Sequence, residues 1–153
     1  MTVEPKIRRA TEADISGVLA LYAQPGANEG LVVRLEDAQA TFRRMSAYAG
    51  YALYVAERAG ALVGTFVLIV IENLTHQGAP SAVVENVVVD EGCRGQGMGT
   101  AMMHFAMDEA RRQRCYKLAL SSNLKRERAH AFYDALGFER HGYSFLVRLD
   151  GDD

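Results

Sequence analysis

The residues best suited to chemistry lie in one stretch past the middle of the chain, where an apolar run ends in a cluster of glycines. Residues 82–89 read Ala-Val-Val-Glu-Asn-Val-Val-Val, and after residues 90–93 comes the series Arg94-Gly95-Gln96-Gly97-Met98-Gly99-Thr100. This order predicts a buried strand, a glycine-rich turn and a helix from Thr100 to about Arg114. Such a junction leaves several backbone N–H groups unpaired at the positive end of a helix dipole, so it predicts a pyrophosphate site. Glycine suits the turn because a Cβ would hold a phosphate away from the backbone.

Two common phosphate-binding patterns do not fit this spacing. In a P-loop counted from Gly92, Met98 stands where the lysine is required. In a dinucleotide fingerprint, Gly95 and Gly97 match, but Thr100 replaces the third glycine and the motif does not follow the first strand. A glycine turn that merely joins a strand to a helix stays open as an alternative.

The elements around this junction alternate between strands and helices. The first helix should begin at a capping box, Thr11-Glu12-Ala13-Asp14, and end near Tyr22. Loops are expected at 24–30 and 72–80. This alternation predicts one α/β domain over residues 1–153, without internal repeats. The remaining expected elements are strands at 6–10, 51–57, 61–71, 82–89, 116–121 and 143–149, and helices at 36–47, 100–114 and 126–136.

Composition narrows the class of protein. The chain has 153 residues, is 49% hydrophobic and carries a formal net charge of −2, which suits one domain with a full core. That charge gives no reason to expect nucleic acid or a membrane surface as a partner. Residues 1–6 lack the apolar core of a signal peptide, and the apolar run 61–71 is too short to span a bilayer. Cys93 and Cys115 are too few for a disulfide framework or a zinc ribbon, so we expect no metal and a cytoplasmic location.

Two motifs carry a family resemblance. The glycine series matches the pattern (Q/R)-x-x-G-x-(G/A) at Arg94, Gly97 and Gly99, and the segment 129–138 reads A-x-x-F-Y-x-x-x-G-F. With these motifs the chain resembles the GNAT superfamily of N-acetyltransferases, closely over about residues 82–149 and only in layout over the first 80 residues. The resemblance implies a GNAT-like α/β sandwich, with a mixed central sheet that splays between its fourth and fifth strands and about four flanking helices.

The resemblance also implies acetyl-CoA as co-substrate and a set of residues that hold it. The backbone of residues 87–89 would pair with the pantetheine arm at the splay, and one N–H, at Val87 or Val88, would polarise the thioester carbonyl. Asn123 follows the fifth strand and, like Tyr133, would face the cofactor. The full expected set is Val87, Val88, Val89, Arg94, Gly95, Gln96, Gly97, Met98, Gly99, Thr100, Asn123 and Tyr133.

Acetyl transfer to an amine also needs an acid for the leaving thiolate, and Tyr133 is the candidate. A phenol with a pKa near 10 can protonate a thiolate of similar basicity, and its ring can pack while its hydroxyl reaches the site. The alternative is that Phe132 and Tyr133 are two core aromatics of an amphipathic helix. Asn123 has an ordinary alternative too, as a residue at a strand end or helix approach.

The candidate base is Glu85. A carboxylate in an apolar strand should face a cleft or a partner, and burial would raise its pKa towards a useful value. Strict alternation places Glu85 with Val87 and Val89 on one face of the strand. A structural ion pair with an arginine is the alternative role for Glu85. Weaker candidates for the base are His76, His130 and His141.

The acceptor is predicted only by class. Residues 85–97 with 115–118 are similar to glucosamine-6-phosphate N-acetyltransferases, and residues 120–133 with 143–145 to aminoalkylphosphonate N-acetyltransferases. Both resemblances imply direct, ternary-complex transfer to the primary amine of a small molecule that can carry a phosphate or phosphonate. Basic side chains could meet that dianion, although such residues are more often solvated surface charges: Arg34, Arg43, Arg44, Lys125 and Arg126.

Two other functions and one assembly stay open. A protein or peptide acetyltransferase, acting on lysine or an amino terminus, would need the loop 72–80 to leave an open groove. A non-catalytic acyl-CoA sensor would keep the glycines without needing Tyr133 or Glu85. Relatives suggest a homodimer, and the segment 143–149 is apolar enough to pair across a dimer interface or within one chain.

Overall fold

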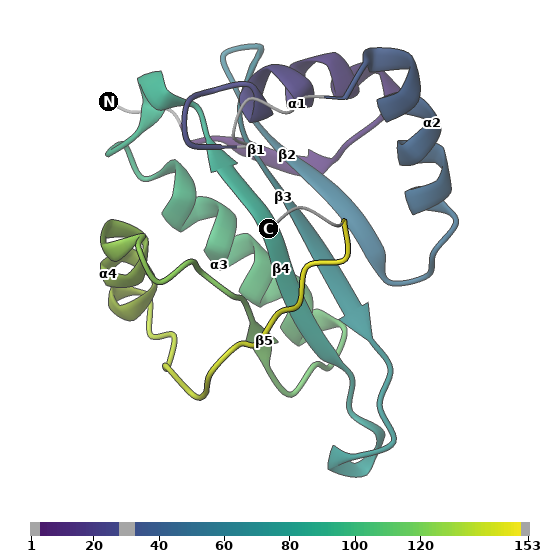
Figure 1. Cartoon of the computed structure of the whole chain (residues 1–153), viewed down its shortest axis with the longest axis vertical. Helices are drawn as coiled ribbons and strands as arrows, with labels where there is room; N and C mark the ends of the chain where they lie inside the picture. Colours follow the sequence, from purple (N-terminus) through teal and green to yellow (C-terminus); the bar gives the residue numbers. More distant parts are fainter. Residues whose placement is uncertain (1–3, 28–32, 151–153) are drawn as a thin grey trace. The chain divides into compact units, whose positions relative to one another are not determined.

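Strands from both halves of the chain form one five-stranded sheet, in the order β1-β2-β3-β4-β5 (Figure 1). The computed structural model describes residues 4–27 and 33–150 and divides them between two units, 4–120 and 121–150. The first unit holds β1 (Lys6–Arg9), α1 (Ile15–Tyr22), α2 (Leu35–Ser46), β2 (Tyr51–Arg58), β3 (Ala61–Ile71), β4 (Ser81–Val89), α3 (Met98–Arg112) and β5 (Leu118–Ala119). The second unit holds α4 (Glu127–Ala135).

The sheet is mixed, as the sequence predicted. Strands β1 to β4 are antiparallel to their neighbours, whereas β5 runs parallel to β4. The two parallel strands pair only at Ala82 with Leu118 and at Val83 with Ala119. Beyond Val83 no strand of the described chain follows β4 on that side, which is the expected splay between the fourth and fifth strands.

Helices cover both faces of the sheet because its central strands are apolar on both sides. On one face, Val55 and Val67 pack with Ile15 and Val18 of α1, and side chains of α2 close around them. On the other face, the ring of Phe105 from α3 meets the rings of Tyr54 and Phe66 edge-on. Burying a side chain of this size contributes about 1.5–3 kcal/mol, so these two layers hold the first unit together.

Glycine allows α3 to approach the sheet closely. A Cβ on Gly64 of β3 would lie 2.5 Å from the sulfur of Met102 and 3.3 Å from the carbonyl oxygen of Val88. Met102 and Met103 are fully buried, so α3 is fixed along its length beneath β3 and β4. The helix that opens at the glycine turn is therefore rigidly mounted.

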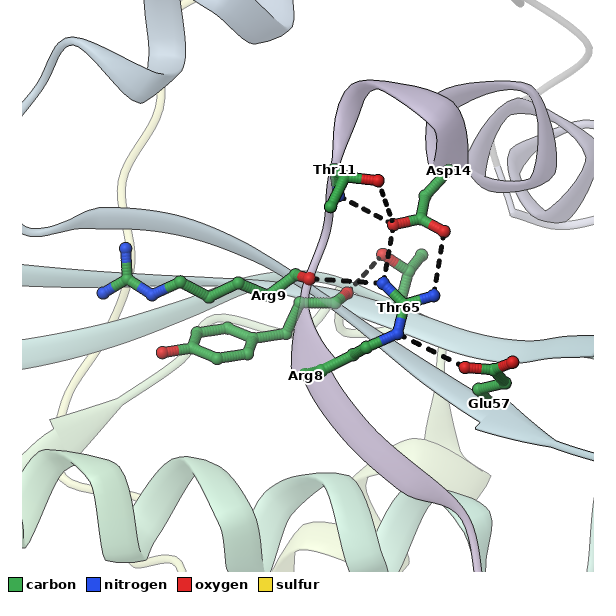
Figure 2. A network of polar contacts seen from close by, with 7 residues as sticks. Arg8, Arg9, Thr11, Asp14, Glu57 and Thr65 are labelled. Atoms are coloured by element: carbon green, nitrogen blue, oxygen red, sulfur yellow. Dashed lines mark hydrogen bonds and ion pairs between the residues drawn. The ribbon is translucent and has the colours of Figure 1, made fainter.

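The capping box forms, and Arg8 ties it to the sheet (Figure 2). The Asp14 carboxylate accepts the backbone N–H of Thr11 at 2.7 Å and pairs with the Arg8 guanidinium at 2.7 Å. Arg8 also reaches Glu57 of β2 at 3.3 Å. The Arg8 guanidinium lowers the pKa of Asp14 to about 2, helped by hydrogen bonds from Thr11. This network fixes the start of α1 against β1 and β2.

Three predicted elements differ from the structure by more than one residue at an end, and the others differ by at most one. Helix α3 begins at Met98 instead of Thr100 and ends at Arg112 instead of Arg114, where Arg114 adopts a φ of 63°. The strand expected at 116–121 is only Leu118–Ala119. The strand expected at 143–149 does not form, because a strand needs a hydrogen-bonding neighbour and the regular element of its unit is α4.

Part of the loop expected at 24–30, residues 28–30, lies outside the described residues. In the described parts of the chain, no helix combines the length and the apolar character needed to cross a membrane.

Candidate functional site

Strand β4 contains a bulge at the position of the candidate base. Val67 of β3 faces Glu85, and Thr65 faces Val88, so Phe66 between them faces two residues, Asn86 and Val87. Asn86 takes a φ of 54°, the left-handed conformation that asparagine tolerates better than most residues. The extra residue bends β4 and interrupts its ladder with β3.

The bulge corrects the predicted alternation. Directly paired residues of antiparallel strands share a face, and Val67 and Thr65 lie two residues apart, so Glu85 and Val88 lie on the same face. Strict alternation had placed Glu85 with Val87 and Val89. Glu85 is also exposed, although burial was expected to raise its pKa. Burial therefore does not support Glu85 as the base, and the structural support that remains is its position next to the bulge.

The edge of β4 after Val83 is open. The strand continues to Val89, but on the side of β5 its backbone groups from residue 84 onward meet no strand in the described chain. Val88 is buried and Val87 is partly exposed. An open strand edge that is held in place by β3 can pair with an extended ligand by main-chain hydrogen bonds.

The glycine loop leads from this edge into α3. After a short 3-10 turn, Glu91–Cys93, Gly95 and Gly97 adopt φ values of 75° and 84°, which side chains rarely allow. A Cβ on either residue would meet no atom within 4 Å, so the loop is open on that side. Met98 is buried and anchors the first turn of α3, while residues 94–97 are exposed.

The backbone N–H groups of this loop divide into bonded and free ones. Those of Gly92 and Cys93 bond to Asp90, at 3.0 and 2.9 Å. Within the described residues, no protein acceptor is recorded for the N–H groups of residues 94–97, and the first bond of α3 is from Ala101 to the carbonyl of Gly97 at 3.0 Å. No acidic residue lies in the first turn of α3. Free N–H groups at the positive end of a fifteen-residue helix fit a phosphate or pyrophosphate.

Two residues that the sequence analysis missed contact this loop through their side chains. Arg58, at the end of β2, bonds to Gln96 and Cys93, and Gln24, just after α1, accepts the N–H of Glu91 at 2.7 Å. These contacts join residues 35 to 67 positions apart. No local pattern indicates them; only the folded sheet brings the residues together.

Asn123 and Tyr133 lie in the unit of residues 121–150. The Asn123 side chain accepts the N–H of Lys125 at 2.9 Å, and its carbonyl bonds to His130 at 2.8 Å, so it shapes the approach to α4. The Tyr133 ring meets Phe132 and Phe138 edge-on. Burial raises the pKa of the Tyr133 phenol, against the opposing charge of Arg126. Their roles towards the cofactor stay predictions.

The three histidines that are candidates for the base have different surroundings. The ring of His76 stacks on Tyr116 with centroids 3.8 Å apart and bonds to Thr75 at 3.1 Å. The His130 ring is hydrogen-bonded to the Asn123 carbonyl, and His141 is exposed. Over residues 4–27 and 33–150, no group of three or more histidines, cysteines or carboxylates is arranged to hold a metal ion.

The basic residues around α2 have partners on nearby side chains of the protein. Arg34 pairs with Glu36 and Asp37 at 2.9 and 3.5 Å, and Arg43 pairs with Glu12 at 3.0 Å. Arg44 bonds to the Thr41 hydroxyl at 2.9 Å. These side chains match the description of solvated helix charges. Lys125 and Arg126 have no ion-pair partner within the described residues.

Comparison with known proteins agrees with this geometry. Residues 19–138 match the model of the acetyltransferase (GNAT) family. The chain is 35% identical over 91 residues to glucosamine 6-phosphate N-acetyltransferase of Trypanosoma brucei brucei, a match that covers 60% of this chain and 58% of that enzyme. It is 29% identical over 152 residues to aminoalkylphosphonate N-acetyltransferase of Salmonella typhimurium, with 94% and 91% covered.

A solved structure extends the likeness to the whole fold. A putative acetyltransferase from Agrobacterium tumefaciens superposes with a TM-score of 0.88 at 33% identity, over 94% of this chain and 99% of that one. The family match spans the strand β4, the glycine loop and α4 together. The chain therefore belongs to the acetyltransferase (GNAT) family and carries the enzyme domain of that family.

Proposed function

We propose that this protein is an acetyl-CoA-dependent N-acetyltransferase, an acyltransferase that moves an acetyl group to the primary amine of a small molecule. The observation that carries the proposal is the open edge of β4 running directly into the glycine loop. One feature suits the extended pantetheine arm and the other suits the pyrophosphate. Because the family match covers residues 19–138, we propose a single acetyltransferase domain over residues 1–153.

The residues that hold the donor are assigned as the resemblance implies. The free N–H groups of residues 94–100 would bind the pyrophosphate, and the backbone of residues 87–89 would pair with the pantetheine arm. The bulge at Asn86 supports the assignment of Val87 or Val88 as donor to the thioester carbonyl, because it interrupts the ladder there. Acetyl-CoA, when bound, supplies an activated thioester carbonyl.

The transfer is direct. The amine nitrogen forms a bond to the carbonyl carbon, and the carbon–sulfur bond breaks. Before the attack, one proton of the ammonium passes to Glu85, directly or through water. As the carbon–sulfur bond breaks, Tyr133 gives its proton to the departing thiolate and then takes up the second proton that the new amide nitrogen loses. Burial raises the pKa of Tyr133, so this phenol is protonated at neutral pH and has a proton to give. The main-chain N–H at the bulge stabilises the negative charge that develops on the carbonyl oxygen.

The acceptor is proposed to be a small amine that carries a phosphate or phosphonate. Support comes from the names of the two curated relatives, which acetylate glucosamine 6-phosphate and aminoalkylphosphonates. Arg34 and Arg43 are already paired, so Lys125 and Arg126 are the better candidates to meet that dianion. We also propose a cytoplasmic location, without nucleic acid or membrane as partner.

A homodimer is proposed from the carboxy-terminal segment. Most side chains of residues 143–149 are apolar, and these are largely exposed, including Tyr143, Phe145 and Leu149 at 91–92%. Exposed apolar runs of this length are typical of surfaces that meet another protein. A second copy of the chain would cover them.

The test is a calorimetric titration of the purified protein with acetyl-CoA, followed by thiol release with a panel of amines. We expect micromolar binding and release of free thiol with small phosphorylated amines, but not with their unphosphorylated counterparts. Release with peptides alone would indicate a protein acetyltransferase. Binding without turnover on any amine would indicate an acyl-CoA sensor, and no binding would contradict the proposal.

A further inference from the structure

Arg58 connects the hairpin between β2 and β3 to the glycine loop. Its Nη1 donates to the Gln96 side-chain oxygen at 2.8 Å, and its Nη2 donates to the Cys93 sulfur at 3.1 Å. The Gln96 amide in turn donates to the carbonyl of Gly92 at 3.2 Å. The guanidinium therefore contacts the loop on both sides of Arg94 and Gly95, and the Gln96 side chain links it back to the beginning of the loop.

The mounting of Arg58 is rigid at its base. It is the last residue of β2 and pairs with Ala61 across the hairpin turn, and its side chain is only partly exposed. Cys93 is buried, so the contact of Arg58 with the Cys93 sulfur lies against the core. A planar guanidinium holds two acceptors in fixed directions, which a lysine cannot do.

Among the described residues, no carboxylate lies within ion-pair distance of Arg58. Its two acceptors on the loop are an amide oxygen and a cysteine sulfur. Asp90 and Glu91, at the start of the loop, carry negative charge that would oppose an anion. The positive charge of Arg58, which is hydrogen-bonded to Gln96, offsets that repulsion near the free N–H groups.

The loop needs such support because its own backbone is permissive. Glycine can adopt many backbone conformations, so Gly95 and Gly97 by themselves do not fix the direction of the free N–H groups of residues 94–97. Ordering a flexible loop on binding lowers affinity, whereas a loop that is ordered beforehand avoids this loss.

We propose that Arg58 is a positioning residue of the cofactor site: it holds residues 93–96 in the anion-binding conformation and supplies positive charge behind them. The identity of the anion as the pyrophosphate of acetyl-CoA rests on the proposed function. The bracing of the loop does not depend on it, and can be measured in the ligand-free protein.

The test compares Arg58→Gln and Arg58→Lys with the wild type, and with Arg111→Gln as a control that removes an exposed arginine of α3 paired with Asp108. Nitrogen-15 relaxation of the ligand-free protein should give order parameters near 0.85 for residues 94–97, falling below about 0.6 in Arg58→Gln. The Kd for acetyl-CoA should rise about tenfold in Arg58→Gln. Arg58→Lys should recover part of that affinity at low salt only, because it keeps the charge and loses the fork. The control should stay within twofold.

The outcomes separate this inference from the proposed function. A loop equally rigid in the wild type and in Arg58→Gln would overturn the brace, and a mobile loop with unchanged Kd would overturn its role towards the cofactor. Failure of the wild type to bind acetyl-CoA would refute the proposed function and that role, while the relaxation data would still decide the brace. Gln96→Ala removes one of the two contacts of Arg58, that with Gln96, without altering β2. It therefore repeats the relaxation test if Arg58→Gln does not fold, with a smaller expected loss of order.

Discussion

Arginines near helix α2 and those near the glycine loop are placed in opposite surroundings. Arg34 and Arg43 each face carboxylates at 2.9–3.0 Å on the surface of the protein. Beside the loop, Arg58 bonds to the Gln96 amide oxygen and the Cys93 sulfur, and in the described chain neither Arg58 nor the exposed Arg94 has an ion-pair partner. Surface pairs such as those of α2 contribute little to stability, typically about 0–1 kcal/mol.

From this difference we expect an anion to bind on the loop side of the first unit. The loop offers free N–H groups, a helix dipole and positive charge that, among the described residues, no carboxylate pairs with. Around α2, an incoming phosphate would have to displace the carboxylates that pair with Arg34 and Arg43. Binding of the donor should therefore be sensitive to single changes in the loop, and binding of the acceptor should tolerate changes in α2.

The largest effect is expected from Gly97→Val. A β-branched residue is strained at a φ of 84°, and its side chain would enter space beside the loop that holds no other atom within 4 Å of the Cβ. We expect the Kd for acetyl-CoA to rise at least about 100-fold, more than 2.7 kcal/mol, while circular dichroism shows a folded protein. Gly78→Val is the matched control, since Gly78 has a φ of 80° and equally open surroundings outside the loop. Normal binding by Gly97→Val would remove the loop from the site.

Tyr133→Phe should affect turnover and leave binding intact. Loss of a general acid lowers kcat by about 10²-fold or more, whereas the Kd for acetyl-CoA should stay within twofold. Because burial raises the pKa of the phenol, the wild-type kcat should fall only above about pH 10, and the variant should lack that alkaline limb. Tyr143→Phe alters an exposed tyrosine of the same unit and serves as the control. Equal kcat for Tyr133→Phe and wild type would leave Tyr133 as a packing residue.

Local elements of this fold could be predicted because their signals are local. The capping box at Thr11, the hairpin turn before Ala61 and the glycine turn before Met98 each depend on residues next to one another. The mixed sheet was implied by the family resemblance and not by any local signal, and the strand pairing confirms it. The strand expected at 143–149 shows the limit, since an apolar pattern does not supply the neighbouring edge that a strand requires.

The sequence predicts where the candidate site lies, but it does not predict the local geometry of that region. The bulge depends on the left-handed conformation of Asn86. Because asparagine also fits a regular exposed strand position, the residue type alone does not distinguish a bulge from a regular strand. That one residue reversed the faces assigned to Val87 and Val88 relative to Glu85. Arg58 and Gln24 were missed because their contacts cross 35 to 67 residues and exist only after the sheet has formed.

Asn86 tests how strongly the donor side depends on that bulge. Asn86→Val places a β-branched residue at a φ of 54°, whereas Asn86→Gly relieves the strain. We expect the Kd for acetyl-CoA to rise about tenfold in the valine variant, roughly 1.4 kcal/mol, and to change less than twofold in the glycine variant. The same order should appear in their melting temperatures. If valine binds as well as glycine does, the bulge does not set the position of the donor.

Asp14→Asn should change stability and leave the donor site alone. Arg8 and Thr11 lower the pKa of Asp14 from 3.8 to about 2 in the folded state, so its contribution is fully present above pH 4 and is lost as the pH falls towards 2. The variant should be about 1 kcal/mol less stable at pH 7 and should lose this part of the acid dependence. Urea titrations between pH 2 and pH 7 measure both effects. A parallel pH dependence in wild type and variant would exclude Asp14 as its source.

The smallest effects are expected around α2. Arg43→Gln breaks a surface pair with Glu12, so stability should fall by less than about 1 kcal/mol, and Arg43→Lys should restore most of the loss. If the acceptor phosphate is met elsewhere, the KM for a phosphorylated amine should change less than twofold in both variants. Arg126→Gln, tested with the same amine, should raise that KM by about tenfold, because one charge-assisted contact to the dianion is lost. The reverse result, with Arg43 sensitive and Arg126 tolerant, would place the acceptor beside α2 and show that its ion pairs open when substrate binds.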